Sequence, residues 1–113
     1  MRPVAVRPCI VVRAFIDPAL MDEFEHWYRE VHLPHVREIP GVVSAFRARG
    51  YRRNVNWMAI YALSDDSQVQ GTLTSAEAER ARQDWERWLP VINEFSIEVY
   101  AGLGPIPIYQ HFN

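Results

Sequence analysis

Apolar residues follow two different periods along this chain, and their alternation predicts four strands and two helices. Period-two stretches rich in β-branched and aromatic residues predict strands at about residues 9–16, 42–53, 56–63 and 94–101. Apolar residues at helical spacing predict one helix after Asp17 and a second at about residues 75–89. The order β-α-β-β-α-β predicts an α+β, ferredoxin-like fold, in which a four-stranded antiparallel sheet carries both helices on one face.

The first helix has a clear start and a predicted break. Asp17 is the candidate N-cap, and Pro18 fits the first helical position. The predicted core stripe comprises Leu20, Phe24, Trp27 and Val31, and Met21 and Tyr28 flank it. Pro34 lacks a backbone donor and disfavours helical geometry at the residue before it, so we expect a break there. A short turn holding Val36 and Ile39 should follow and end at Pro40-Gly41.

The second helix is predicted from a capping pattern and an apolar stripe. Thr74 and Glu77 fit a capping box, and Pro90 should end the helix. The predicted stripe comprises Ala78, Ala81, Trp85, Trp88 and Ile92. The segment SDDSQVQGT before this helix is predicted to be a polar connector.

Length and charge narrow the class of protein. The 113 residues predict a single domain, 1–113, with a core at about 8–101 and an extended C-terminal tail at 102–113. The net charge of −2 gives no basic surface for nucleic acid or an anionic membrane, so neither partner is expected. The sequence shows no secretory pattern and no apolar run long enough to span a membrane, which predicts a cytoplasmic protein.

The strands carry apolar side chains on both faces, which predicts that the sheet packs on helices one way and on a second subunit the other way. The mixed positions include Phe46, Met58, Ile60, Phe95, Ile97 and Val99. We therefore expect a homodimer. The charged strand residues Arg13, Arg47, Arg49 and Glu98 are expected to form ion pairs across strands or between subunits, or alternatively to hold an anionic ligand.

The stretch EHWYREVHLPHVREIPGVVSAFRARGY, residues 25–51, resembles the EthD-like branch of the dimeric α/β-barrel superfamily. The shared features are His32, Pro34 and the pair Pro40-Gly41 before a strand. The resemblance implies a dimer that forms a barrel from two sheets, with a pocket in each subunit between sheet and helices. The superfamily includes cofactor-independent monooxygenases, muconolactone-type isomerases, polyketide cyclases and haem-binding proteins, so the resemblance implies no single reaction.

His32 is the leading catalytic candidate. Imidazole changes charge near neutral pH, and the resemblance implies that the histidine of this motif transfers a proton. The alternative is that His32 only stabilises the end of a helix, which contributes about 0.3–1 kcal/mol. His35 is a candidate for substrate binding near the mouth of a pocket. His26 is expected on a solvated helix face, and the position of His111 in the tail cannot be assigned.

No metal or bound cofactor is predicted. His32 and His35 are three residues apart, with Glu30 or Glu38 as a conceivable third ligand, but Pro34 lies between the histidines and spoils their presentation on one helix. No HExxH motif, Gly-rich phosphate loop, GxSxG motif or dinucleotide motif occurs. The resemblance leaves haem, with His32 as its axial ligand, as a minor alternative.

The aromatic residues suggest a hydrophobic ligand. Tyr28 is predicted to assist His32 in catalysis, and the predicted substrate-binding aromatics are Trp27, Tyr61, Trp85 and Trp88. Ala78 and Ala81 would leave room for a cavity, although core packing also explains these residues. The sequence thus suggests an EthD-like small-molecule enzyme that acts on a hydrophobic, aromatic or polyketide-like substrate by cofactor-independent acid/base chemistry, as isomerase, cyclase or monooxygenase. The alternative is a non-catalytic ligand-binding or structural dimer.

Overall fold

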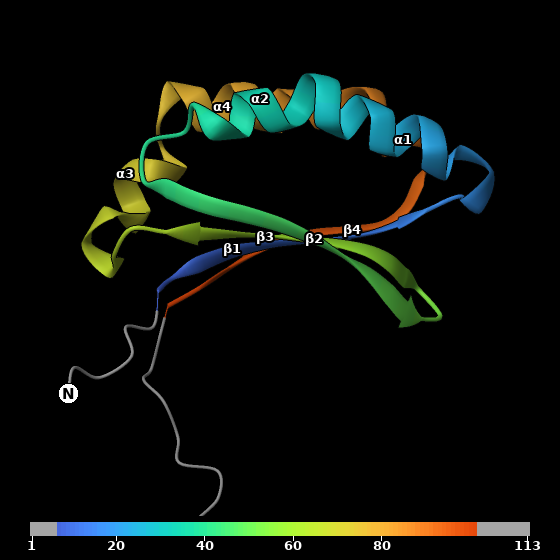
Figure 1. The fold of residues 1–113 in the computed structure, drawn as a ribbon, viewed down its shortest axis with the longest axis horizontal. Helices are drawn as coiled ribbons and strands as arrows, with labels where there is room; N and C mark the ends of the chain where they lie inside the picture. The colour runs from blue at the N-terminus through green and yellow to red at the C-terminus, as the bar shows by residue number, and fades with distance from the viewer. Residues whose placement is uncertain (1–6, 102–113) are drawn as a thin grey trace, which may run out of the picture.

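The four predicted strands form one antiparallel sheet in the order β2-β3-β1-β4, which confirms the ferredoxin-like topology (Figure 1). The computed structural model describes residues 7–101, so the predicted tail and His111 lie outside the described residues. The strands are β1 (Cys9–Ile16), β2 (Val42–Arg52), β3 (Val55–Leu63) and β4 (Ile92–Tyr100). Each boundary lies within two residues of the sequence prediction.

The helices cover one face of this sheet (Figure 1). The helical segments are α1 (Met21–Trp27), α2 (Leu33–Arg37), α3 (Val69–Leu73) and α4 (Ala76–Gln83). The first of them follows a 3-10 turn, Pro18–Leu20, whose N-cap Asp17 accepts a hydrogen bond from the Ala19 N–H at 2.9 Å. Within residues 7–101, no helix is long and apolar enough to cross a bilayer.

The expected break before Pro34 is wrong, because a π turn replaces it. The turn Tyr28–His32 joins α1 to α2, and the Leu33 N–H donates to the Tyr28 carbonyl five residues earlier. Leu33 keeps helical angles, φ −58° and ψ −40°. A wider turn of this kind accommodates a proline without ending the helix.

The π turn also corrects the predicted core stripe. One extra residue in the turn changes which side chains face the sheet beyond it. Val31, predicted to be in the core, is 42% exposed, whereas His32 is only 2% exposed. Tyr28, predicted to flank the stripe, is buried at its centre. Regular helical spacing therefore predicted Val31 on the buried face, whereas the next residue, His32, occupies that position.

The second helical region differs from the prediction in four details. Its N-cap is Ser75, which accepts from the Ala78 N–H at 3.1 Å, whereas the Thr74 hydroxyl bonds the carbonyl of Gln70. Regular α-helix ends at Gln83, and 3-10 turns, Asp84–Arg87 and Leu89–Val91, continue the segment. The predicted polar connector contains the short helix α3, and the predicted helical residue Ile92 begins β4.

The sheet separates two apolar surfaces. On the helix side, side chains from β1 and β3 join the helices in the core; they include Val12, Ala14, Ile16, Trp57 and Ala59. The other side, here called the open face, carries the alternate residues Val11, Phe15, Phe46, Met58 and Ile60. An ion pair of Arg13 with Glu98 also lies on the open face, as one of the expected cross-strand pairs.

Candidate functional site

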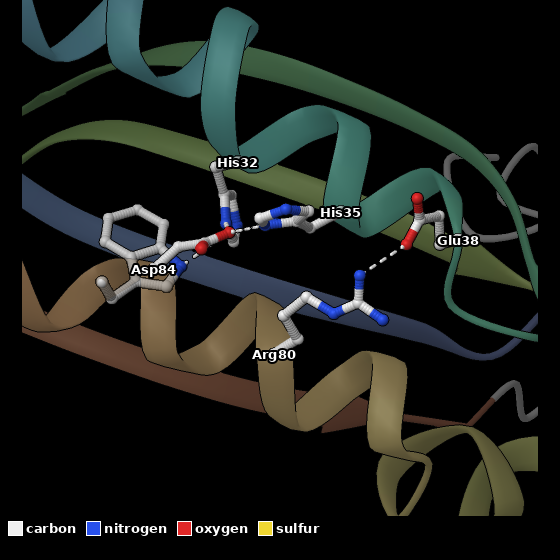
Figure 2. Close-up of polar contacts among 6 residues, drawn as sticks. His32, His35, Glu38, Arg80 and Asp84 are labelled. Atoms are coloured by element: carbon white, nitrogen blue, oxygen red, sulfur yellow. Dashed lines mark hydrogen bonds and ion pairs between the residues drawn. The ribbon is translucent and has the colours of Figure 1, made fainter.

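His32 lies at the end of the π turn with both ring nitrogens hydrogen-bonded. Its Nδ1 is 3.0 Å from Asp84 Oδ2, and its Nε2 accepts from the Trp85 indole N–H at 3.1 Å. The imidazole also stacks on the ring of Trp27, with centroids 5.4 Å apart and planes inclined by 12°. Two elements that are distant in sequence therefore hold this side chain in one orientation (Figure 2).

These partners determine the tautomer of His32. An indole N–H can only donate, so the Nε2 of His32 must carry a lone pair and the ring hydrogen must be on Nδ1. The Nδ1–H then donates to the carboxylate of Asp84. Burial lowers the pKa of His32, and this effect exceeds the opposite effect of Asp84. His32 is therefore neutral at physiological pH.

Asp84 is the functional candidate that the sequence reading missed. Its Oδ2 also bonds the Nδ1 of His35 at 2.7 Å, so one carboxylate oxygen joins two histidines of the first helix (Figure 2). One turn further along, Arg80 pairs with Glu38 at 3.2 Å. The sequence did contain a signal, because Asp84 directly precedes the predicted core residue Trp85 on the facing helix.

A small apolar cavity lies between the sheet and the helices, beside His32. Its volume is about 70 Å³. The lining residues that matter most are His32, Tyr61, Ala78, Ala81 and Trp85. The two alanines leave space at this position, as the sequence suggested. The cavity therefore brings together the leading histidine and two of the predicted substrate-binding aromatics.

Tyr28 and Tyr61 form a buried pair of hydroxyl groups. Their oxygens are 2.8 Å apart, and either hydroxyl can be the donor. Burial raises the pKa of Tyr28, and burial followed by the neighbouring Tyr28 raises the pKa of Tyr61 far above its ordinary value. Both side chains therefore remain protonated. Only Tyr61 lines the cavity, while Tyr28 lies behind it, under the guanidinium of Arg47.

The other predicted site residues lie apart from the cavity lining. Trp27 and Trp88 are buried and pack around Phe24, so their positions match core packing. The side chain of His35 is 30% exposed and reaches the site through Asp84, and His26 is exposed, as expected. Among the described residues, the indole N–H groups of Trp57 and Trp88 have no hydrogen-bond partner.

With Trp85 in its present position, the described residues around His32 leave no space for a haem and form no three-ligand group for a metal ion. Within residues 7–101, no group of three His, Cys, Asp or Glu side chains is arranged to hold a metal. Axial ligation by His32 would require its Nε2 to leave Trp85 or its Nδ1 to leave Asp84. The cavity of about 70 Å³ is also far smaller than a porphyrin.

Comparison with solved structures supports the fold that the resemblance implied. An EthD family protein from Bacillus halodurans superposes with a TM-score of 0.70 at 16% identity, covering 87% of this chain and 100% of that one. SnoaB, a cofactor-independent oxygenase from Streptomyces nogalater, superposes with a TM-score of 0.61 at 17% identity, and the match covers 91% of this chain and 99% of SnoaB. HapK from Hahella chejuensis superposes with a TM-score of 0.61 at 19% identity, and the match covers 88% of this chain and 95% of HapK. No protein-family model and no curated protein matches the sequence. The chain has the ferredoxin-like fold of EthD-like proteins.

Proposed function

We propose that this protein is a small-molecule enzyme of EthD-like type, in which His32 transfers a proton on a hydrophobic, aromatic substrate without a bound cofactor. The observation that carries the proposal is the Asp84–His32 hydrogen bond at the wall of an apolar cavity. A carboxylate that holds one ring nitrogen orients an imidazole and leaves its second nitrogen as the base. The solved structures of the same fold include a cofactor-independent oxygenase, which agrees with this class of chemistry.

Substrate binding in this proposal requires Trp85 to move. Its indole N–H occupies the lone pair of His32 Nε2, which is the only basic site of that ring. The cavity of about 70 Å³ is also smaller than the roughly 300–1,000 Å³ of ordinary ligand pockets. Displacement of Trp85 would enlarge the space and free the base in one step, so a substrate O–H or acidic C–H would replace the indole N–H.

Tyr61 supplies the second polar group of the proposed site. A single hydrogen lies between the hydroxyls of Tyr28 and Tyr61, so the pair retains one further O–H. When Tyr28 donates to Tyr61, the remaining O–H belongs to Tyr61, which faces the cavity. This group would stabilise negative charge that develops on a substrate oxygen as His32 removes a proton.

Proton transfer can be tested on a bicyclic ketone with acidic α-hydrogens, 2-tetralone, by following deuterium exchange in D₂O by NMR. The wild-type protein should accelerate exchange above the buffer rate. His32→Asn should reduce this acceleration by about 10²–10⁴-fold, the usual contribution of a general base. His26→Asn is the matched control, since His26 is exposed on the same helical segment, and it should exchange like wild type. Equal rates in the His32→Asn variant and wild type would contradict the proposal.

The gating role of Trp85 has its own prediction. Trp85→Phe removes the indole N–H from His32 and leaves an aromatic ring of similar shape. Binding of 1-naphthol, followed by the ¹⁵N shift of His32 Nε2, should therefore be tighter in this variant than in wild type. Trp88→Phe is the matched control, because Trp88 is equally buried and its N–H has no partner in the described part of the chain. The same affinity change in both variants would rule out the gate.

The second candidate function is a non-catalytic ligand-binding or structural protein of the same fold. The small cavity and the position of Trp85 beside His32 favour it. Naphthol binding without any acceleration of tetralone exchange would support a binding protein. Neither binding nor exchange would support a structural role.

We also propose that the protein is a homodimer formed through the open face of its sheet. Phe46 is 56% exposed there, on the same face as the partly exposed residues Phe15, Met58 and Ile60. An apolar sheet face of this kind is usually covered by another element or another chain. The described residues contain no element that covers it, and a second copy would place two such faces together.

A further inference from the structure

We propose that Asp84 is a positioning residue that also couples His32 to the charge state of His35. The two histidines share one oxygen, Oδ2, at 3.0 Å from His32 Nδ1 and 2.7 Å from His35 Nδ1. The consequence for catalysis rests on the proposed role of His32 as the base. The coupling itself is a property of the protein without substrate.

The shared oxygen constrains both imidazoles. A carboxylate only accepts hydrogen bonds, so each Nδ1 must carry a hydrogen for both contacts to form. Trp85 independently requires the same tautomer of His32. Replacement of the Asp84 carboxylate by a neutral amide would therefore weaken the contacts that hold both Nδ1 hydrogens in place, and it would allow His35 to adopt either tautomer.

The three side chains differ in their access to solvent, so a proton from solvent reaches one histidine of the cluster more readily than the other. The side chain of His32 is 3% exposed and that of Asp84 is 11%, whereas that of His35 is 30%. A proton from solvent can thus add to the Nε2 of His35 while its Nδ1–H continues to donate to the carboxylate of Asp84. This addition turns a hydrogen bond between a neutral imidazole and a carboxylate into an ion pair without moving either side chain.

The surrounding charges leave Asp84 as the main partner of His35. The facing helical segment presents Asp84 to His35 and, one turn away, Arg80 to Glu38 (Figure 2). On its own helical segment, the titratable or charged sequence neighbours of His35 are His32, Arg37 and Glu38. Because Arg80 and Glu38 pair with each other, their charges largely offset at this distance.

Protonation of His35 should weaken His32 as a base. A neutral His35 leaves the full negative charge of Asp84 to support protonation of His32. A charged His35 shares that carboxylate and adds its own repulsion, and both effects disfavour a second positive charge on His32. The Coulombic effect of His35 on the pKa of His32 has this direction, downward. The proposed activity of His32 should therefore be lower when His35 is charged than when it is neutral.

The test is a pH titration of the histidine ring nitrogens by long-range ¹H–¹⁵N NMR on the protein without ligand. In wild type, the His32 signals should show the Nδ1–H tautomer and a second inflection at the pH where the His35 ring signals themselves change. His35→Asn keeps an N–H donor for Asp84 but cannot titrate, so this inflection should vanish. His26→Asn, at an exposed histidine far from the carboxylate in sequence, should leave it unchanged. A His32 titration with the same shape in wild type and His35→Asn would overturn the coupling.

A second variant separates coupling from orientation. Asp84→Asn keeps the shape of the side chain and removes its charge, so the His32 inflection should become smaller, because only the direct repulsion from His35 remains, and the tautomers of His35 should mix. Unchanged His32 and His35 spectra in this variant would overturn the positioning role. Because these readouts need no substrate, failure of tetralone exchange would leave the coupling intact, and loss of the coupling would leave proton transfer by His32 standing.

Discussion

At the scale of single residues, the chemistry of the site depends on which atoms of His32 are engaged. The sequence identified the residue but left open whether it caps a helix or transfers a proton. In the structure the imidazole is buried, and its partners assign the ring hydrogen to Nδ1, which donates to Asp84, while Nε2 accepts from Trp85. Burial favours its neutral form, which ties the protonation of this residue to the stability of the fold.

The stability of the protein should therefore depend on pH through His32. Its pKa in the folded state is lowered from the ordinary 6.5, so the unfolded chain binds the proton more strongly. The stabilising contribution is full above about pH 6.5 and is lost as the pH falls towards the folded-state pKa. Urea unfolding at pH 7.5 and pH 5.5 should show a smaller loss on acidification in His32→Asn than in wild type.

The same experiment contains its control. His26→Asn should lose as much stability on acidification as wild type, because His26 is exposed. At pH 7.5, His32→Asn should itself cost about 1–3 kcal/mol, since the buried indole N–H of Trp85 loses its acceptor. An acid-induced loss that is identical in His32→Asn and wild type would show that another group is responsible.

At the scale of elements, the π turn explains the main error of the sequence reading. Strict helical spacing placed Val31 in the core, but the turn Tyr28–His32 contains an extra residue before Pro34. A proline in the sequence predicts a disturbed helix, but it does not predict whether the helix ends or continues through a wider turn. The packing of α2 on the sheet and on α4 determines that outcome. The direction of the histidine therefore followed from tertiary contacts.

The connection from α2 to β2 gives a prediction at this scale. Gly41 has φ +90°, and an added Cβ would lie 2.5 Å from Thr72 Oγ1, so Gly41→Ala should destabilise the protein by about 1–3 kcal/mol. Gly71 is the matched control, because a Cβ there meets nothing within 4 Å and the residue lies inside α3. Gly71→Ala should gain up to about 1 kcal/mol from helix propensity. Urea unfolding of both variants checks this, and equal effects would contradict the turn geometry.

At the scale of the whole molecule, the helices cover one side of the sheet, and nothing within residues 7–101 covers the other side (Figure 1). Fold topology was predictable because the order of strands and helices leaves few ways to pair four antiparallel strands. The apolar character of the open face was predictable, since both sets of alternating strand residues include apolar side chains. Its partner is a property of the assembly, which one chain does not contain.

The proposed homodimer predicts a particle of twice the chain mass of 13.2 kDa in size-exclusion chromatography with light scattering. Phe46→Glu would bury an unpaired carboxylate in the interface, at a cost of several kcal/mol, and should yield the mass of a single chain. Val31→Glu is the matched control, because Val31 is 42% exposed on the helical side. A single-chain mass for wild type at micromolar concentration, or dissociation of both variants, would contradict an interface at the open face.

The sequence by itself determined the order of the elements and the antiparallel sheet, because period and capping residues are local properties, and it made His32 the leading candidate because of its titratable side chain. It also placed Ala78 and Ala81 correctly beside a cavity. Only the tertiary structure decided that Asp84, 52 residues from His32, meets two histidines at one oxygen. The physical reason is that this contact depends on how two helices pack across a sheet, and no local pattern encodes that distance.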